Sequence, residues 1–181
     1  MIVTSLASFY RQSGRAICTS DQEELMDKYL TPTTVEDIDY VSPRLRKADY
    51  NECLASTGQH PRIVLHKSLD LGGTSLTLRA PDGGRLGLCG VVPSHLENAG
   101  IVWMCATDDI YQYQTAFLRK SKAALDYLAG DYAVIFNCVD ARNTLHMKWL
   151  DWMGFTFINK HEKYGAAKLP FYEFLRINKN V

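Results

Sequence analysis

The stretch Asn143-Thr-Leu-His-Met-Lys-Trp-Leu-Asp-Trp-Met-Gly154-Phe155 decides how the C-terminal half of this 181-residue chain is interpreted. Its first residue is a favourable helix N-cap and Gly154 a favourable helix end, so the spacing predicts a helix over 143–153. The apolar run 132–139 before it predicts a buried central strand. The aromatic and β-branched residues 155–158 after it predict another strand. These elements form a strand–helix–strand unit.

The segments on either side of this unit predict more strands and helices of the same sheet. Pro81-Asp82-Gly83-Gly84, between two alternating apolar runs, is typical of a β-hairpin turn. Asp108 or Asp109 can cap the amphipathic helix that precedes the central strand. The other predicted strands are 34–41, 75–79, 85–92, 100–106 and 171–177, and the other predicted helices are 43–56, 60–69 and 110–128. This order predicts an α+β arrangement around one mixed sheet.

The first thirty residues predict an N-terminal appendage to a body that spans residues 31–181. Within the appendage, residues 21–30 favour a short helix, because Ser20 and Glu23 have the spacing of a capping box. Thr31-Pro32-Thr33 is expected to end that helix. The appendage is the first place where we expect contacts with a partner or a second copy.

The composition excludes several classes of protein. Lys+Arg and Asp+Glu both number 20, so the formal net charge is zero, and the basic excess of a general nucleic-acid binder is missing. A net charge near zero gives little repulsion between copies, which is compatible with a homodimer. No apolar run approaches the length of a membrane span. The five cysteines are scattered without CxxC spacing, which indicates reduced thiols and neither a disulfide framework nor a metal site.

The segment 143–155 resembles the Gcn5-related N-acetyltransferase (GNAT) superfamily, whose members commonly carry Asn, a helix and then Gly-Phe at this spacing. GNAT-like proteins of short-tailed bacteriophages are more similar still. They share a Trp-containing fourth strand that ends in Thr-Asp, here Trp103 to Asp108, and a late Leu-Pro-Phe, here 169–171. The resemblance implies an α+β, three-layer GNAT-like acyl-CoA N-acyltransferase fold with a central mixed β-sheet that is splayed between its fourth and fifth strands.

The resemblance also implies acetyl-CoA as the cofactor. In the GNAT fold the free edge of the fourth strand binds the pantetheine arm, and the following turn and helix N-terminus bind the pyrophosphate. The implied cofactor-binding residues are Met104, Cys105, Ala106 and Thr107 of the fourth strand, Gln112, Tyr113 and Gln114 after it, and Asn143.

Two features depart from the GNAT pattern. The segment after the fourth strand has no glycine and contains Asp108 and Asp109, whereas the usual pyrophosphate loop is rich in glycine. The usual tyrosine general acid lies seven residues after the helix-opening Asn, and that position is Leu150 here.

The catalytic candidates are therefore drawn from other positions. Cys138, Tyr111 and His146 are candidate replacements for the acid. Asn137 is a candidate because an amide in an apolar strand needs hydrogen-bond partners, which a ligand can supply. The base is left open among three polar residues near predicted strand ends, which are Glu97, Asp140 and His95.

Two functions of different classes follow. The first is a phage-encoded N-acetyltransferase of the host cytoplasm, which transfers an acetyl group from acetyl-CoA to an amine of a bacterial host protein or a small molecule. The second is a GNAT-shaped protein with little or no catalysis. It either binds and modulates a host enzyme during infection, or packs inside the virion as an internal virion protein. The glycine-free loop and Leu150 favour the second function, and the residues Asn137 and Asn143 favour the first.

Overall fold

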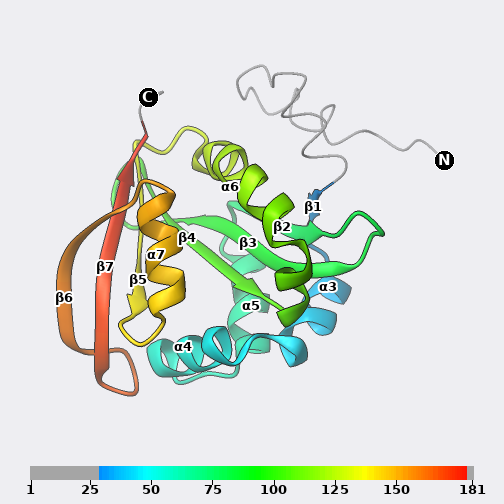
Figure 1. Cartoon of the computed structure of the whole chain (residues 1–181). Helices are drawn as coiled ribbons and strands as arrows, with labels where there is room; N and C mark the ends of the chain where they lie inside the picture. The colour runs from blue at the N-terminus through cyan, green and yellow to red at the C-terminus, as the bar shows by residue number, and fades with distance from the viewer. Residues whose placement is uncertain (1–28, 179–181) are drawn as a thin grey trace.

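Residues 29–178 are described by the structure, which is a computed structural model. Across this range one mixed sheet has the strand order β1-β2-β3-β4-β5-β7-β6 (Figure 1). Its strands are β1 (Leu30–Pro32), β2 (Thr74–Arg79), β3 (Arg85–Pro93), β4 (Ala99–Ala106), β5 (Val134–Asp140), β6 (Thr156–Tyr164) and β7 (Leu169–Ile177). Neighbouring strands are antiparallel except β4 and β5, which are parallel. A parallel pair needs a crossover connection, and a helix between the two strands supplies it.

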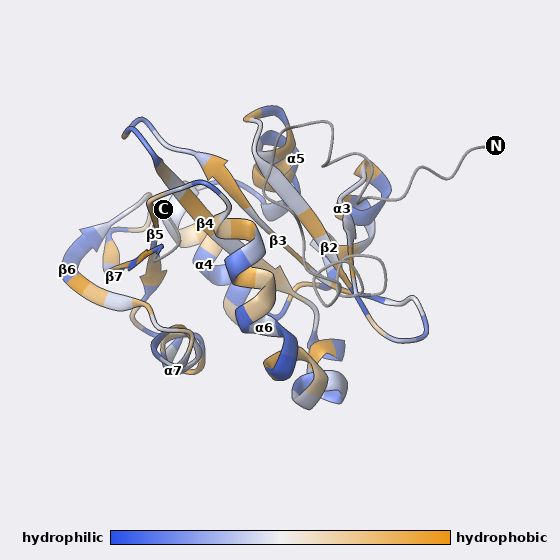
Figure 2. Ribbon diagram, turned by 90° about the horizontal axis from the view of Figure 1, so that it is seen from above, coloured by the Kyte–Doolittle hydropathy of each residue, from blue (hydrophilic) through white to orange (hydrophobic). Residues whose placement is uncertain are grey.

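Helices cover both faces of the sheet. The α-helices are α3 (Val35–Val41), α4 (Lys47–Thr57), α5 (Pro61–Asp70), α6 (Gln114–Ala129) and α7 (Thr144–Trp152), and the 3-10 helices are η1 (Ser42–Arg44) and η2 (Asp108–Tyr113). Figure 2 shows α3 and α5 on one side of the sheet and α6 and α7 on the other. The predicted α+β fold with a mixed sheet between helical layers is confirmed.

Two hydrophobic clusters hold these layers together. The smaller one joins Ile38 of α3 and Leu65 of α5 to Leu88 of β3. The larger one joins α6 and α7 to the opposite face of the sheet, with Leu128 and Leu150 among its buried side chains. Each fully buried leucine contributes about 1.5–3 kcal/mol of transfer free energy. The sheet is thus packed on both faces, as the apolar run of β5 predicts.

The predicted first strand at 34–41 is wrong, because this segment is helix α3. Thr34 and Asp37 form a capping box in which the Thr34 hydroxyl accepts from the Asp37 N–H over 3.3 Å. The Asp37 carboxylate accepts from the Thr34 N–H over 3.2 Å. Ile38 and Val41 are both buried and lie three residues apart, a helical spacing. The first strand is instead β1, which pairs with β2 and includes Leu30, the expected last residue of the appendage helix.

Two predicted helices begin later than expected. The helix predicted from Pro43 is preceded by the 3-10 turn η1 and starts at Lys47. The helix predicted from Ile110 starts at Gln114, because Asp108–Tyr113 is the 3-10 helix η2. Neither η2 nor α6 has a side-chain N-cap hydrogen bond, which removes the capping that the sequence suggested. The 81–84 hairpin turn and the helix ending at Gly154 are confirmed.

The appendage lies outside the described residues up to position 28, so its helix stays a prediction. Among the helices of residues 29–178, none is long and apolar enough to cross a membrane.

Candidate functional site

The parallel strands β4 and β5 separate after three residue pairs. They pair at Ala99 with Val134, Gly100 with Ile135, and Ile101 with Phe136, and then stop. Beyond this point β4 continues alongside β3 to Ala106, and β5 continues alongside β7 to Asp140. The sheet therefore forks between β4 and β5, which confirms the splayed sheet that the resemblance implied.

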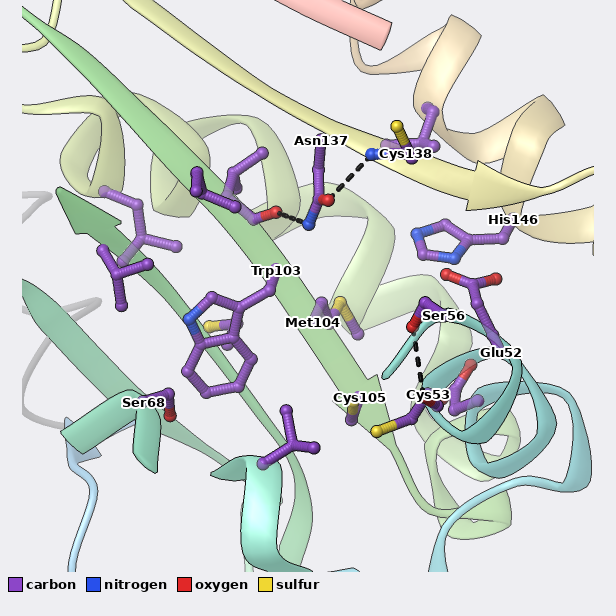
Figure 3. Close-up of a pocket in the computed structure, with 18 of the residues that line it drawn as sticks. Glu52, Cys53, Ser56, Ser68, Trp103, Met104, Cys105, Asn137, Cys138 and His146 are labelled. Carbon is purple, nitrogen blue, oxygen red and sulfur yellow. Dashed lines mark hydrogen bonds between the residues drawn. The ribbon is translucent and has the colours of Figure 1, made fainter. Parts of the chain in front are cut away.

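The side chain of Asn137 lies at the branch point of the fork. The register of the three pairs places the next ladder bond between the Cys138 N–H and the Val102 carbonyl. Instead, the Cys138 N–H donates to Asn137 Oδ1 over 2.7 Å, and Asn137 Nδ2 donates to the Val102 carbonyl oxygen over 2.7 Å (Figure 3). The amide thus lies within a ladder bond and holds the strands apart. We expected a ligand to supply the hydrogen-bond partners of the Asn137 amide, but the protein backbone supplies them.

A cavity of about 510 Å³ opens at the fork. Its volume is in the range of small-molecule sites. Residues from both faces of the sheet line it, so it passes between the separated strands. On the α4 and α5 side the lining includes Glu52, Cys53, Ser56, Leu65, Trp103 and Cys105, and on the α6 and α7 side it includes Met104, Phe117, Leu128, His146, Trp149 and Leu150. Figure 3 shows Glu52, Met104, Asn137, Cys138 and His146 around this space.

The edge of β4 offers the free N–H and the free carbonyl of one residue, Met104, to the fork. Backbone groups alternate in direction along a strand, so those of Val102, Met104 and Ala106 face away from β3 and toward the fork. No described residue pairs with the N–H or the carbonyl of Met104. The Ala106 carbonyl accepts from the Arg46 N–H over 2.8 Å, and the Ala106 N–H donates to Asp49 Oδ2 over 2.8 Å. The N-terminus of α4 therefore closes the far end of the fork.

The four predicted pantetheine contacts of β4 consequently divide into two pairs. Met104 and Cys105 line the cavity. Ala106 is bonded to Arg46 and Asp49, and Thr107 donates both its N–H and its hydroxyl to the Leu86 carbonyl on β3. Neither Ala106 nor Thr107 lines the cavity.

Glu52 of α4 is the ionisable carboxyl of the cavity that sequence reasoning missed. Burial raises its pKa from 4.5 to about 7, and the nearby Asp49 carboxylate adds to the shift. Asn143 Nδ2 donates to Glu52 Oε2 over 3.0 Å, and this bond favours the ionised form. Asn143, predicted to contact cofactor, thus caps α7 through the His146 N–H and orients Glu52. No local signal could reveal a contact between residues 91 positions apart.

Two aromatic side chains of α7 present unpaired nitrogen atoms in the cavity wall. His146 Nδ1 and Trp149 Nε1 are buried without a hydrogen-bond partner among the described residues. Burial lowers the pKa of His146 to about 4, so its imidazole is neutral at neutral pH. Trp149 stacks on Phe117 at a centroid distance of 5.6 Å. Buried polar atoms of this kind normally have partners, so these two nitrogens are exceptions in the wall of the cavity.

Cys138 and Tyr164 form a second polar contact of the cavity wall. Tyr164, at the end of β6, and Cys138 both line the cavity, and each affects the pKa of the other. Burial raises the pKa of the Cys138 thiol above its ordinary value and that of Tyr164 to about 12. At neutral pH both groups are protonated, so Cys138 is placed to contact a ligand but is a weak nucleophile. Tyr164 was not among the sequence candidates, because β6 and β5 are brought together only by β7.

The remaining candidates lie away from the cavity. Tyr111 is exposed on η2, with its ring 5.9 Å from the Arg46 guanidinium carbon. Gln112, Tyr113 and Gln114 do not line the cavity either. The same holds for the three candidate bases: Asp140 is paired with Arg142, and His95 and Glu97 are exposed in the loop before β4. Within residues 29–178 no group of three or more His, Cys, Asp or Glu side chains could hold a metal ion.

The chain is similar to known proteins in structure and not in sequence. No protein-family model matches the chain, and no curated protein matches it by sequence. Ribosomal-protein-S5-alanine acetyltransferase from Vibrio fischeri is similar in structure, with a TM-score of 0.58 and 16% identity over 84% of this chain and 94% of that one. A variant of spermidine N-acetyltransferase from Vibrio cholerae is also similar, with a TM-score of 0.60 and 11% identity over 83% of this chain and 94% of that one.

A GNAT-family acetyltransferase from Streptococcus pneumoniae gives a TM-score of 0.56 and 12% identity over 82% of this chain and 98% of that one. At sequence identities this low, the similarity shows a shared fold only. The chemistry of the site has to be argued from the residues of this chain. The chain has the acyl-CoA N-acyltransferase fold of the GNAT superfamily.

Proposed function

We propose that the protein is an N-acetyltransferase that transfers an acetyl group from acetyl-CoA to a primary amine. The observation that carries this proposal is the fork between β4 and β5, which opens on a cavity lined by an ionisable glutamate. The fork leaves a free peptide edge at Met104, where an extended arm can add as a short strand.

The residues of the cavity fit the pantetheine arm of acetyl-CoA in part. The unpaired N–H and carbonyl of Met104 are available to the amides of such an arm, and Trp149 and His146 line the cavity beside them. The apolar wall of α6 and α7 suits its methylene groups. When bound, acetyl-CoA would supply an acyl group activated as a thioester.

Glu52 is the proposed general base. A carboxyl with a pKa of about 7 is partly ionised at neutral pH and is basic enough to accept a proton from an attacking amine. Asn143 Nδ2 donates to one oxygen of this carboxyl, and Glu52 lines the cavity. The amine nitrogen forms the new C–N bond while its proton moves to Glu52.

Tyr164 is the proposed general acid. Leu150 occupies the usual acid position and is a buried member of the main core cluster, so it has no proton to give. Tyr164 keeps its proton at neutral pH because burial raises its pKa to about 12, and it lies in the cavity wall beside Cys138. As the C–S bond breaks, the phenol can protonate the leaving thiolate directly or through the Cys138 thiol.

Two measurements test this proposal. Acetyl-CoA should raise the Tm of the protein, because a ligand that binds only the native state stabilises it. Release of free thiol with an amine acceptor should then depend on Glu52. The E52Q variant should lose about 10²–10⁴-fold in kcat and keep its Tm shift. The matched control is E162Q, since Glu162 is exposed on β6. An absent Tm shift at millimolar acetyl-CoA would exclude the proposal.

A second candidate is a GNAT-shaped binding protein without catalysis. The bonds of Arg46 and Asp49 to Ala106 favour it, because they occupy backbone groups that an extended arm would otherwise use. The glycine-free η2 favours it too, since α6 begins only at Gln114. A pull-down that recovers a stoichiometric bacterial enzyme, together with no acetyl-CoA binding, would support this candidate.

The biological setting is a proposal that rests on the sequence resemblance, except for the homodimer, which rests on the zero net charge. It comprises a phage origin, a bacterial host protein as acceptor or partner, action in the host cytoplasm or inside the virion, and a homodimer. Size-exclusion chromatography with light scattering tests the last point, and mass spectrometry of purified particles tests packaging.

A further inference from the structure

The lining of the cavity on the α4 and α5 side restricts the chemical class of the amine acceptor. Its walls are largely apolar or weakly polar, with Trp103 and Cys105 from β4, Cys53 from α4 and Leu65 from α5. Figure 3 shows Trp103, Cys105, Cys53 and Ser56 on this side of the fork.

The hydroxyl groups of this half are already bonded within their own helices. Ser56 Oγ donates to the Cys53 carbonyl over 3.1 Å, and Ser68 Oγ donates to the Leu65 carbonyl over 2.7 Å. At the rim, Lys67 Nζ donates to Gln59 Oε1 over 2.9 Å. The wall therefore offers little hydrogen bonding to a polar acceptor body.

The carboxylates of the cavity can neutralise one ammonium group. Asp49 and Glu52 are the only acidic side chains among the described lining residues. Asp49 accepts two bonds from the Arg46 guanidinium and one from the Ala106 N–H, so its charge is already compensated. Glu52 is left as the single carboxyl for a cationic acceptor. A second ammonium group in this half would be desolvated without a partner, which is costly.

Trp103 supplies an aromatic surface with one unused donor. A Cβ on Gly90 would approach Trp103 Cζ2 to 2.9 Å, so the indole lies against the glycine backbone of β3. Its Nε1 is buried and has no hydrogen-bond partner among the described residues. Aromatic rings prefer to stack or meet edge to face, so the part of the indole that lines the cavity favours an aromatic or apolar group.

We infer that the acceptor is a small monoamine carried on an aromatic or apolar body, and is not a polyamine. This inference rests on the proposed function and names its substrate class. The amine points to Glu52, and the body packs against Trp103 and the thiols of Cys53 and Cys105. The reaction is acetyl transfer to the amine nitrogen, with the thiol of CoA as the leaving group.

An acceptor panel tests the inference. The full-length protein is assayed for thiol release from acetyl-CoA with tryptamine, 2-phenylethylamine, spermidine and a peptide with an N-terminal alanine. The expected kcat/KM for the two aromatic amines is at least about 100-fold above that for spermidine. A penalty of this size is within the range expected when a polar group of the substrate is left unpaired in an apolar pocket. Acetyl-CoA binding is measured in parallel by the Tm shift.

Trp103 is examined with a matched tryptophan control. W103F should raise KM for tryptamine about tenfold and leave kcat within about twofold, because it shrinks the aromatic surface on which the body of the amine packs. W152F is the control, since Trp152 is 47% exposed and does not line the cavity, and it should change neither constant.

Each outcome of the panel decides a different point. Preference for the aromatic amines, lost in W103F and kept in W152F, supports the inference. Preference for spermidine or the peptide, or no turnover of any of the four amines despite acetyl-CoA binding, overturns the inference while acetyl-CoA binding itself stands. Absence of both turnover and acetyl-CoA binding overturns the proposed function, and the inference falls with it.

Discussion

Asn137 Nδ2 donates to the Val102 carbonyl oxygen over 2.7 Å, at the residue where β4 and β5 stop pairing. The same amide accepts from the Cys138 N–H over 2.7 Å, so one side chain replaces one ladder bond by two. The strands are held apart while the Val102 carbonyl and the Cys138 N–H both keep a hydrogen-bond partner. This arrangement explains how a sheet can fork in its centre and remain stable.

The first prediction concerns this amide. N137A should lower the free energy of unfolding by about 1–3 kcal/mol, because it leaves the Val102 carbonyl and the Cys138 N–H without partners. Urea unfolding measures the change. N159A is the control, because Asn159 is exposed on β6 and should tolerate the change. Equal unfolding midpoints for N137A and the native protein would contradict the proposal that the Asn137 amide stabilises the fork between β4 and β5.

The second prediction concerns the pH dependence of catalysis by Glu52. A base must be deprotonated to act, so kcat/KM for an amine should rise with pH through a midpoint near 7. This limb should disappear in E52Q. A profile with its acid limb near pH 4.5 would show that a carboxyl with an ordinary pKa, and not Glu52, is the base.

The same carboxyl predicts a stability effect of definite sign. The folded protein keeps the Glu52 proton up to about pH 7, whereas the unfolded chain loses it near the ordinary value of 4.5. Stability is therefore lost as pH rises through this window, by an amount on the order of 3 kcal/mol. The E52Q variant lacks this loss and should gain stability relative to the native protein between pH 4 and pH 8. Urea unfolding at both pH values is the measurement, and an unchanged difference would argue against a raised pKa.

The third prediction concerns Tyr164. Y164F removes the proton donor and should lower kcat about 10²-fold with little change in KM, because the phenol acts on the leaving group and not on the bound amine. Y172F is the comparison, since Tyr172 lies on β7 and does not line the cavity. Full activity in Y164F would assign the proton to another donor.

The fourth prediction compares two aspartates that each pair with an arginine. Asp49 is 2% exposed and bonds Arg46 and the Ala106 N–H, so D49A should cost about 3–5 kcal/mol in urea unfolding. Asp39 pairs with Arg62 on the surface, where solvent screens the charges, so D39A should change stability far less. Comparable losses in the two variants would mean that α4 is not fastened to β4 through Asp49.

The fifth prediction concerns the packing of the Trp103 indole against Gly90. A methyl group at position 90 would meet the Thr74 carbonyl at 2.5 Å and Trp103 Cζ2 at 2.9 Å. G90A should therefore cost about 1–3 kcal/mol and change the near-UV circular dichroism of the tryptophans. In G84A the nearest atom is the flexible Asp82 Oδ1 at 3.1 Å, so this control should be close to native. An unchanged spectrum in G90A would show that the indole does not rest on this glycine.

Much of the architecture follows from local patterns. The apolar run of β5, the Asp-Gly turn between β2 and β3, and the Asn143 and Gly154 boundaries of α7 each depend on nearest neighbours in sequence. The apolar residues Val35, Ile38 and Val41 predict a strand over 34–41, although their alternation is imperfect. The capping box of Thr34 and Asp37 was the competing local signal, and it prevailed because Asp37 also bonds Arg79 and Arg85.

The sequence by itself therefore determined the order of most elements and the α+β class, because hydrophobic periodicity and capping act over a few residues. The fork between the fourth and fifth strands was implied by the resemblance to GNAT proteins. Only the tertiary structure decided which of these residues share the cavity. Glu52 meets Asn143, Tyr164 meets Cys138, and Asp49 closes the end of β4. Each of these contacts joins segments far apart in the chain, and its strength depends on burial that exists only once the sheet and its helices have packed.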